Sequence, residues 1–183
     1  MTTALIIVDI QNDYFPNGKM ALSNPEKAAT NAAKVLASFR QHNKENIFHV
    51  QHIAASPELG FFLPDTEGAA IHEAVQPEND EQLIIKHFAN SFLNTDLESK
   101  LKANGVTKVV VVGMMTHMCI DATVRAAVDL GFEATLLEDA CATTNIAYGD
   151  QVVPAAQVHT AFVGALSGMY ATVISTDAFL QNN

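Results

Sequence analysis

The amino-acid sequence predicts an α/β fold with three layers, in which a six-stranded, mainly parallel sheet lies between two layers of helices. Apolar runs of strand length alternate along the chain with segments of helical periodicity. These runs are apolar throughout rather than at every second position, which is typical of parallel strands that helices cover on both faces. Right-handed crossovers then join successive strands.

Each predicted strand is a short run of mostly apolar residues, and the six cover residues 4–8, 46–51, 83–85, 109–112, 133–137 and 171–174. The predicted helices between them cover residues 23–41, 96–103, 120–130 and 154–166. The first helix begins at the capping sequence Ser23-Asn24-Pro25-Glu26, which places a proline in the first turn. Glycines follow the other three helices and end them, at Gly105, Gly131 and Gly168.

Length and composition limit the class of protein. At 183 residues and 19.7 kDa the chain fits a single domain over residues 1–183. Hydrophobic residues make up 49% and charged residues 16%, which excludes a disordered chain and a membrane-spanning one. The formal net charge of -10 and the lack of a basic patch argue against a nucleic-acid partner. No basic region precedes the short apolar run at the amino terminus, so we expect a cytoplasmic protein.

Polar residues with catalytic chemistry follow three of the predicted strands. Asp9 ends the first strand, Lys86 ends the third, and Cys119 follows the fourth, where a loop enters a helix. Ligand sites of parallel sheets collect at these carboxyl ends. Free amides and the dipole of the helix are expected to stabilise a thiolate at Cys119 and an oxyanion formed by its attack on a carbonyl. Each residue taken alone also fits a packing or surface role.

Three runs of the sequence resemble the three motifs of the isochorismatase-like cysteine hydrolases. They are Val8-Asp9-Ile10-Gln11-Asn12-Asp13-Tyr14-Phe15, Ile85-Lys86-His87-Phe88-Ala89-Asn90-Ser91-Phe92 and Val112-Gly113-Met114-Met115-Thr116-His117-Met118-Cys119-Ile120-Asp121-Ala122-Thr123. The resemblance implies a Rossmann-like fold and a catalytic triad of Asp9, Lys86 and Cys119. It also implies a cis peptide at Met114-Met115 and an oxyanion hole from the amides of Met115 and Cys119.

The resemblance further implies hydrolysis of a C–N bond of the amide type through a Cys thioester, since family members that cleave a vinyl ether generally lack the cysteine. Vinyl ether cleavage is kept as the alternative activity. The predicted substrate is a small molecule, neutral or weakly charged, because no basic residue other than Lys86 lies in a motif. The aperiodic segment from Ala54 to Asp80 and six aromatic residues are candidates for substrate binding: Tyr14, Phe15, Phe61, Phe62, Phe88 and Phe92.

No metal and no cofactor are expected. The nicotinamidase branch of the family binds a metal through Asp-x-His, whereas this chain has His49-Val50-Gln51-His52. Residues i and i+3 of a strand point to opposite faces, so His49 and His52 are expected to chelate poorly together. No G-x-G-x-x-G loop is present. The other histidines are expected to be surface, packing or helix-entry residues, with His87 facing away from Lys86: His42, His72, His87, His117 and His159.

Two readings of other classes remain open. In the first, the chain is a catalytically idle α/β binding module. Such a module is expected to have no thiol that reacts quickly with iodoacetamide at neutral pH. In the other it is a thiol redox protein that uses Cys119 with Cys141, although the two cysteines lack C-x-x-C spacing.

A homo-oligomer is expected, most simply a symmetric dimer or its multiples. The helices predicted at residues 120–130 and 154–166 carry more apolar surface than one sheet face needs, and surplus apolar area usually marks an interface. The alternative is that the carboxyl-terminal segment from Ser175 to Asn183 covers this surplus.

Overall fold

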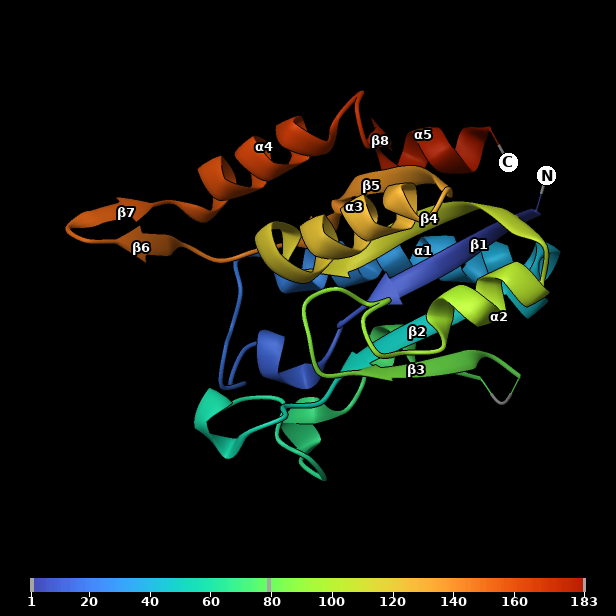
Figure 1. The fold of residues 1–183 in the computed structure, drawn as a ribbon. Helices are drawn as coiled ribbons and strands as arrows, with labels where there is room; N and C mark the ends of the chain where they lie inside the picture. The colour runs from blue at the N-terminus through green and yellow to red at the C-terminus, as the bar shows by residue number, and fades with distance from the viewer. Residues whose placement is uncertain (1, 79, 183) are drawn as a thin grey trace.

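A computed structural model describes residues 2–78 and 80–182 (Figure 1). The central sheet is parallel throughout, and its strand order is β3-β2-β1-β4-β5-β8. The strands are β1 (Thr2–Val8), β2 (Ile47–His52), β3 (Gln82–Lys86), β4 (Val106–Met114), β5 (Glu133–Ala142) and β8 (Ala171–Ile174). The predicted fold class is confirmed.

Helices cover both faces of this sheet. The helices α1 (Pro25–His42) and α5 (Thr176–Gln181) pack on one face, and α2 (Leu97–Ala103), α3 (Asp121–Asp129) and α4 (Ala155–Leu166) lie on the other. The sheet therefore separates two hydrophobic cores. Along β1, Leu5 and Ile7 enter the core beneath α1, whereas Ala4, Ile6 and Val8 enter the core beneath α2 and α3. This is why the strand is apolar at successive positions.

Two elements differ from the prediction. The chain forms a separate antiparallel hairpin of β6 (Ile146–Tyr148) and β7 (Gln151–Val153), whose three-residue strands are too short to show a period in the sequence. The carboxyl-terminal segment forms α5, which the Ser175 side chain caps by accepting from the Ala178 N–H. This helix packs on α1 and β5, on the face opposite α4. The suggestion that the tail covers α4 is therefore wrong.

The chain order reverses between β1 and β4, and this is the position at which α/β sheets open a crevice. The two strands approach closely there, because Val8 pairs with Gly113 and a Cβ at Gly113 would lie 1.9 Å from the Val8 carbonyl oxygen. Gly113 also has a φ of +131°, which side chains rarely allow. Only glycine therefore lets the loop after β4 leave directly beside Asp9.

No helix in the described ranges 2–78 and 80–182 is both long and apolar enough to cross a bilayer.

Candidate active site

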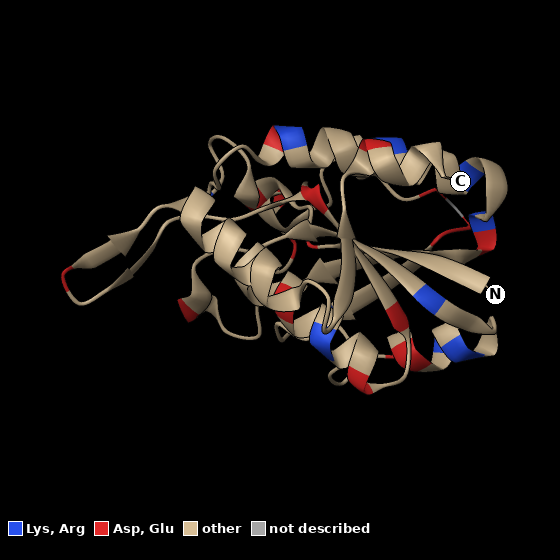
Figure 2. Ribbon diagram, turned by 90° about the horizontal axis from the view of Figure 1, so that it is seen from above, with Lys and Arg blue, Asp and Glu red and all other residues tan. Residues whose placement is uncertain are grey.

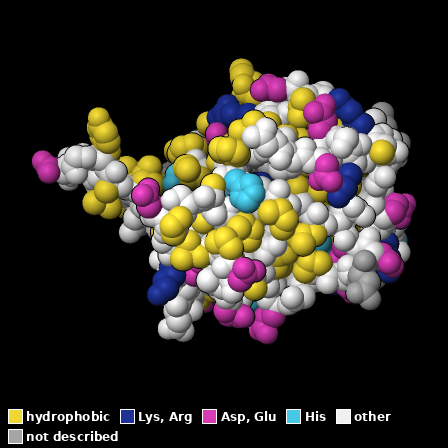
Figure 3. Space-filling model, turned by 60° about the horizontal axis from the view of Figure 1, so that its bottom comes forward, with side chains coloured by type: hydrophobic (Ala, Val, Ile, Leu, Met, Phe, Trp, Pro, Cys, Tyr) yellow, Lys and Arg dark blue, Asp and Glu magenta, His cyan; other side chains and the backbone are white. Residues whose placement is uncertain are grey.

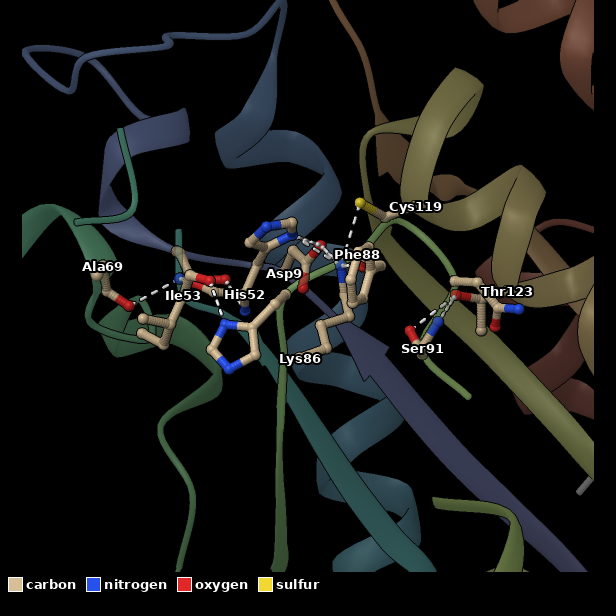
Figure 4. A network of polar contacts seen from close by, with 12 residues as sticks. Asp9, His52, Ile53, Ala69, Lys86, Phe88, Ser91, Cys119 and Thr123 are labelled. Carbon is tan, nitrogen blue, oxygen red and sulfur yellow. Dashed lines mark hydrogen bonds and ion pairs between the residues drawn. The ribbon is translucent and has the colours of Figure 1, made fainter. Parts of the chain in front are cut away.

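Four neighbouring strands each deliver one polar residue to the crevice (Figure 4). Asp9 follows β1, His52 ends β2 and Lys86 ends β3. Cys119 lies in a π-helical turn (Thr116–Ile120) between β4 and α3. The structure thus brings Asp9, Lys86 and Cys119 together, as the strand ends and the motifs predict, and it adds His52.

The ammonium group of Lys86 lies at the centre of the cluster. Its Nζ is 2.7 Å from Oδ2 of Asp9 and donates to Sγ of Cys119 at 3.2 Å. It also contacts Nδ1 of His52 at 3.0 Å and the carbonyl oxygen of Phe88 at 3.0 Å. Asp9, Lys86 and Cys119 are all buried. A buried ammonium is stable there only because these acceptors replace its hydration.

Burial decides the protonation of the thiol. Burial raises the pKa of Cys119 well above its usual value, the carboxylate of Asp9 raises it further, and Lys86 only partly opposes both. Burial lowers the pKa of Lys86, but Asp9 and Cys119 outweigh it and raise that pKa overall. These shifts favour a neutral thiol beside an ammonium–carboxylate pair in the free protein and argue against the expected thiolate. A neutral thiol is alkylated slowly in an active enzyme too, so slow alkylation alone does not identify an idle module.

His52 is a member of the site that the sequence analysis missed. Burial and the nearby Lys86 lower the pKa of its imidazole to about 4, so the ring is neutral at pH 7. Because Nδ1 accepts from Lys86, the ring proton lies on Nε2. The signal was available, since His52 is a polar residue at the end of an apolar strand. It was considered only as a metal ligand with His49, whose Nε2 instead lies 2.7 Å from Glu81.

Two other residues of the first motif hold the loops around the site. The Gln11 side chain accepts from the N–H of His52 at 2.8 Å and donates to the carbonyl oxygens of His52 and Ala69, at 2.8 and 2.7 Å. The buried Asp13 carboxylate accepts from the N–H of Phe62 at 2.7 Å and of Lys19 at 3.0 Å. Gln11 and Asp13 therefore fasten the long segment between β2 and β3 beside Asp9. Neither residue was singled out from the sequence.

The backbone after β4 offers amides near Cys119. The Met114-Met115 peptide bond is cis. The Met115 carbonyl accepts from the N–H groups of Met118 and Ile120, at 3.0 and 3.2 Å, which fixes the turn. Within the described residues the N–H of Met115 itself makes no hydrogen bond.

The six aromatic candidates divide into two groups. Tyr14 is buried edge-on against Phe62 and also contacts Phe61, and the burial that raises its pKa is reinforced by the nearby Cys119 and Asp9. Phe88 follows Lys86 and is 46% exposed. Tyr14, Phe62 and Phe88 therefore lie next to the cluster, and Phe61 packs behind them on Tyr14 and Phe62. Phe15 stacks on His72, and Phe92 stacks on Phe132, so their packing gives no support to a role in substrate binding.

The remaining histidines have structural partners. His87 lies next to the Ile53 carbonyl oxygen at 2.7 Å. His117 contacts Oγ1 of Thr143 at 2.6 Å, and His159 contacts Oγ1 of Thr116 at 2.9 Å. Cys141 is a buried free thiol that donates to its own strand at the Leu137 carbonyl oxygen.

The cluster also contains three groups that are able to ligate a metal. Donor atoms of Asp9, His52 and Cys119 lie within 4.8 Å of one another. All three, however, face Nζ of Lys86, whose positive charge already occupies the space between them. A metal ion at this place would meet the ammonium at contact distance, so these residues do not fit a resident metal.

Acidification is expected to destabilise the protein through His52. The unfolded chain takes up a proton near pH 6.5, whereas the folded protein resists it until about pH 4, so stability is lost as pH falls between these values. A shift of this size corresponds to about 3 kcal/mol. His52→Asn keeps an acceptor near Nδ1 but removes the titration. Urea unfolding from pH 7 to pH 4 is therefore expected to show a shallower loss of stability for this variant.

His42→Asn, at an exposed position, is the control, and its stability should follow that of the wild type. If the stability of His52→Asn falls with pH as steeply as that of the wild type, the lowered pKa of His52 is contradicted.

Comparison with known proteins agrees with this geometry. Residues 3–178 match the family model of the isochorismatase domain. The chain is 59% identical over 181 residues to the isochorismatase family protein YddQ of Bacillus subtilis, covering 99% of this chain and 100% of that protein. It is 47% identical to a crystal structure from Oleispira antarctica described as an isochorismatase hydrolase, with a TM-score of 0.93, covering 98% of this chain and 96% of that one.

A third similarity extends to an enzyme with a stated activity. The N-carbamoylsarcosine amidase of Thermoplasma acidophilum is 25% identical, with a TM-score of 0.80 over 97% of this chain and 98% of that chain. The family match, the fold and the chemistry of the cluster lead to the same assignment: the chain belongs to the isochorismatase family of hydrolases.

Proposed function

We propose that the protein hydrolyses a C–N bond of a small amide through a covalent thioester on Cys119. The observation that carries this proposal is the position of the Lys86 ammonium, within hydrogen-bond distance of both the Asp9 carboxylate and the Cys119 sulfur. A thiol that burial keeps neutral needs a base within reach, and Asp9 supplies one. The arrangement is that of an activated nucleophile.

In the first half of the reaction Asp9 takes the proton of Cys119 as Sγ attacks the carbonyl carbon. The negative charge moves to the carbonyl oxygen, which the amides of Met115 and Cys119 stabilise. Collapse of this intermediate breaks the C–N bond, and the leaving amine takes the proton from Asp9. A thioester remains on Cys119.

In the second half Asp9 takes a proton from a water molecule, whose oxygen attacks the thioester. The carbon–sulfur bond breaks, the thiolate recovers the proton from Asp9, and a carboxylic acid is released. Lys86 stays protonated throughout and stabilises the carboxylate and the thiolate in turn. His52 accepts from Lys86 and so orients the ammonium toward both partners.

The substrate class follows from the walls of the site. Lys86 already faces four acceptors and is buried, so it offers no free charge to an anionic substrate. Phe88, whose carbonyl oxygen accepts from Lys86, is 46% exposed, and Phe61 is half-buried against the buried Tyr14 and Phe62, so Phe61 and Phe88 offer the aromatic surface. A small neutral or weakly charged amide fits these walls, and the similarity to a carbamoyl amidase supports the same bond type.

A panel of small amides and carbamoyl compounds tests the proposal. Release of amine is measured, and the acyl-enzyme is sought by intact mass spectrometry after acid quenching, with 4-nitrophenyl acetate as a generic acyl donor. An acyl adduct on the peptide with Cys119 is expected. If no amide is cleaved and Cys119 is not acylated, the protein is an idle module. Cleavage of a vinyl ether without an acyl adduct would indicate the alternative activity.

Removal of metals is expected to leave this activity unchanged, because Lys86 supplies the positive charge that a metal would bring to the cluster. The protein is dialysed exhaustively against EDTA and then assayed with and without added zinc or iron. A loss of activity that either metal restores would contradict the proposed cluster chemistry.

We also expect a homo-oligomer. The apolar residues of α3 are buried or half-buried, whereas α4 leaves several of its apolar residues exposed: Ala156, Ala161, Gly164 and Ala165. The surplus apolar surface therefore lies on α4 rather than on both helices.

A further inference from the structure

The loop between β3 and α2, residues 87–96, carries one of the groups that bind Lys86. The carbonyl oxygen of Phe88 accepts from Nζ of Lys86 at 3.0 Å. Residues 87–95 include no Lys, Arg, Asp or Glu, in contrast to α1, where Figure 2 shows charged residues, so ion pairs do not hold this loop. Figure 3 shows the side of the molecule on which β3 lies, with hydrophobic side chains at its surface. Phe88 and Leu93, which follow β3, are 46% and 45% exposed, so their burial contributes little to holding the loop.

A buried pair of hydroxyl groups joins this loop to α3. Oγ of Ser91 and Oγ1 of Thr123 lie 2.7 Å apart, and the N–H of Ser91 donates to Oγ1 of Thr123 at 3.2 Å. Both residues are fully buried, and Figure 4 shows them beside the catalytic cluster. Within residues 2–78 and 80–182 no other hydrogen bond links the loop to α3. Phe92 also packs on Phe132 after α3, but an apolar contact is not directional, whereas hydrogen bonds fix both distance and angle.

Thr123 is joined to the nucleophile by continuous helical backbone. It follows Cys119 by four residues, which is about one helical turn. Ile120, between the π-helical turn and α3, has helical backbone angles (φ -69°, ψ -54°), so the chain passes from one to the other without a hinge. A contact that fixes Thr123 therefore also fixes Cys119.

The two hydroxyls complete a closed ring of contacts around the site. From Lys86 the chain runs through the loop to Ser91, which bonds to Thr123. From Thr123 the helix returns to Cys119, whose Sγ accepts from Nζ of Lys86 at 3.2 Å. A thiol sulfur is a weak acceptor, whereas Nζ also has the Asp9 carboxylate at 2.7 Å. The contact with sulfur is therefore the first to be lost if the loop moves away from α3.

We propose that Ser91 and Thr123 are positioning residues. Their hydroxyl pair, here called the latch, holds the loop against the helix and so keeps the Lys86 ammonium on the Cys119 sulfur. Ser91 lies in the second motif and Thr123 in the third, five residues after Lys86 and four after Cys119. In the described ranges the two hydroxyls make no hydrogen bond with the cluster, so they act only through these two residues. The effect of the latch on the rate rests on the proposed thioester mechanism, whereas its effect on the contact between Nζ and Sγ does not.

Thr123→Val tests the latch, because valine keeps the shape of threonine and lacks the hydroxyl. The kcat of amide hydrolysis is expected to fall by about 10- to 100-fold, since a misplacement of roughly 1 Å near the reacting groups costs up to about 10²-fold. Thr123→Ser restores the hydroxyl and is expected to recover most of this loss. The double variant Ser91→Ala/Thr123→Val is expected to be no slower than Thr123→Val, because both changes remove the same bond.

Thr176→Val is the matched control. Thr176 is also fully buried, and its Oγ1 donates to Oδ1 of Asp139 at 2.7 Å. It begins α5, on the opposite face of the sheet from α3. This variant loses a buried hydrogen bond of the same length and is expected to lose similar stability in urea unfolding, yet to keep the wild-type kcat. An equal loss of kcat in both valine variants would overturn the proposal, because the latch would then act only through general stability.

Crystal structures of the wild type and of Thr123→Val test the contact without any activity measurement. In the variant, Nζ of Lys86 is expected to lie beyond hydrogen-bond distance of Sγ, with its ion pair to Asp9 unchanged. An unchanged contact between Nζ and Sγ would overturn the proposal, even if the rate falls. If the wild type cleaves no amide, the proposed function fails, and this structural comparison still decides the role of the latch. If Thr123→Val does not fold, Ser91→Ala carries the same measurements, because it keeps the N–H bond to Thr123.

Discussion

Cys119→Ala is expected to reduce the rate of amide hydrolysis by roughly 10⁴-fold or more, the loss typical of a covalent nucleophile. The variant removes the atom that forms the thioester, while Asp9 and Lys86 keep their ion pair at 2.7 Å. Cys119 is buried and its sulfur is small, so the fold should tolerate the change with a modest loss of stability. Substrate binding should therefore persist without turnover.

Single-turnover kinetics and intact mass spectrometry measure the effect, with Cys141→Ser as the matched control. Cys141 is the other cysteine, is also buried, and donates to a backbone oxygen that a serine hydroxyl is able to reach. This control is expected to keep near-wild-type activity and to form the acyl adduct. Turnover by Cys119→Ala at the wild-type rate would exclude the covalent mechanism.

The thiol of Cys119 shows how far sequence reasoning reaches into the site. Asp9, Lys86 and Cys119 were predictable, because polar residues at the ends of parallel strands meet at one edge of the sheet. The protonation of Cys119 was not, since it depends on a balance between burial, Asp9 and Lys86 that only the packed site reveals. The start of a helix indicates a thiolate, but burial outweighs it here.

The same limit explains the other omissions. His52 was overlooked because its hydrogen bond with Lys86 is a tertiary contact. Gln11 was overlooked because its three hydrogen bonds reach segments 41 and 58 residues away along the chain. The six strands were predictable because strands buried on both faces have continuous apolar sequences. The hairpin of β6 and β7 left no such signal, because its strands have only three residues each.

Asp9→Asn and Lys86→Met are each expected to lower hydrolysis by roughly 10³-fold or more, and the double variant is expected to be no worse than the more damaging single one. Effects of residues that act as a unit do not add. Asp9→Asn removes the base, and Lys86→Met removes the charge that holds base and thiol together. The activity readout alone, however, does not separate catalysis from folding.

The free energy of unfolding of the three variants separates a loss of catalysis from a loss of folding. Each single variant leaves a buried charge without its partner, which costs about 3–5 kcal/mol, whereas the neutral double variant should recover much of this loss. Urea unfolding at pH 7 is therefore expected to rank the double variant above both singles, although all three are inactive. Lys108→Met is the control, because its pair with Glu133 at 2.8 Å is exposed and should contribute little. If the double variant loses as much stability as the sum of the single losses, Asp9 and Lys86 do not act as a coupled pair, and the proposed role of Lys86 is wrong.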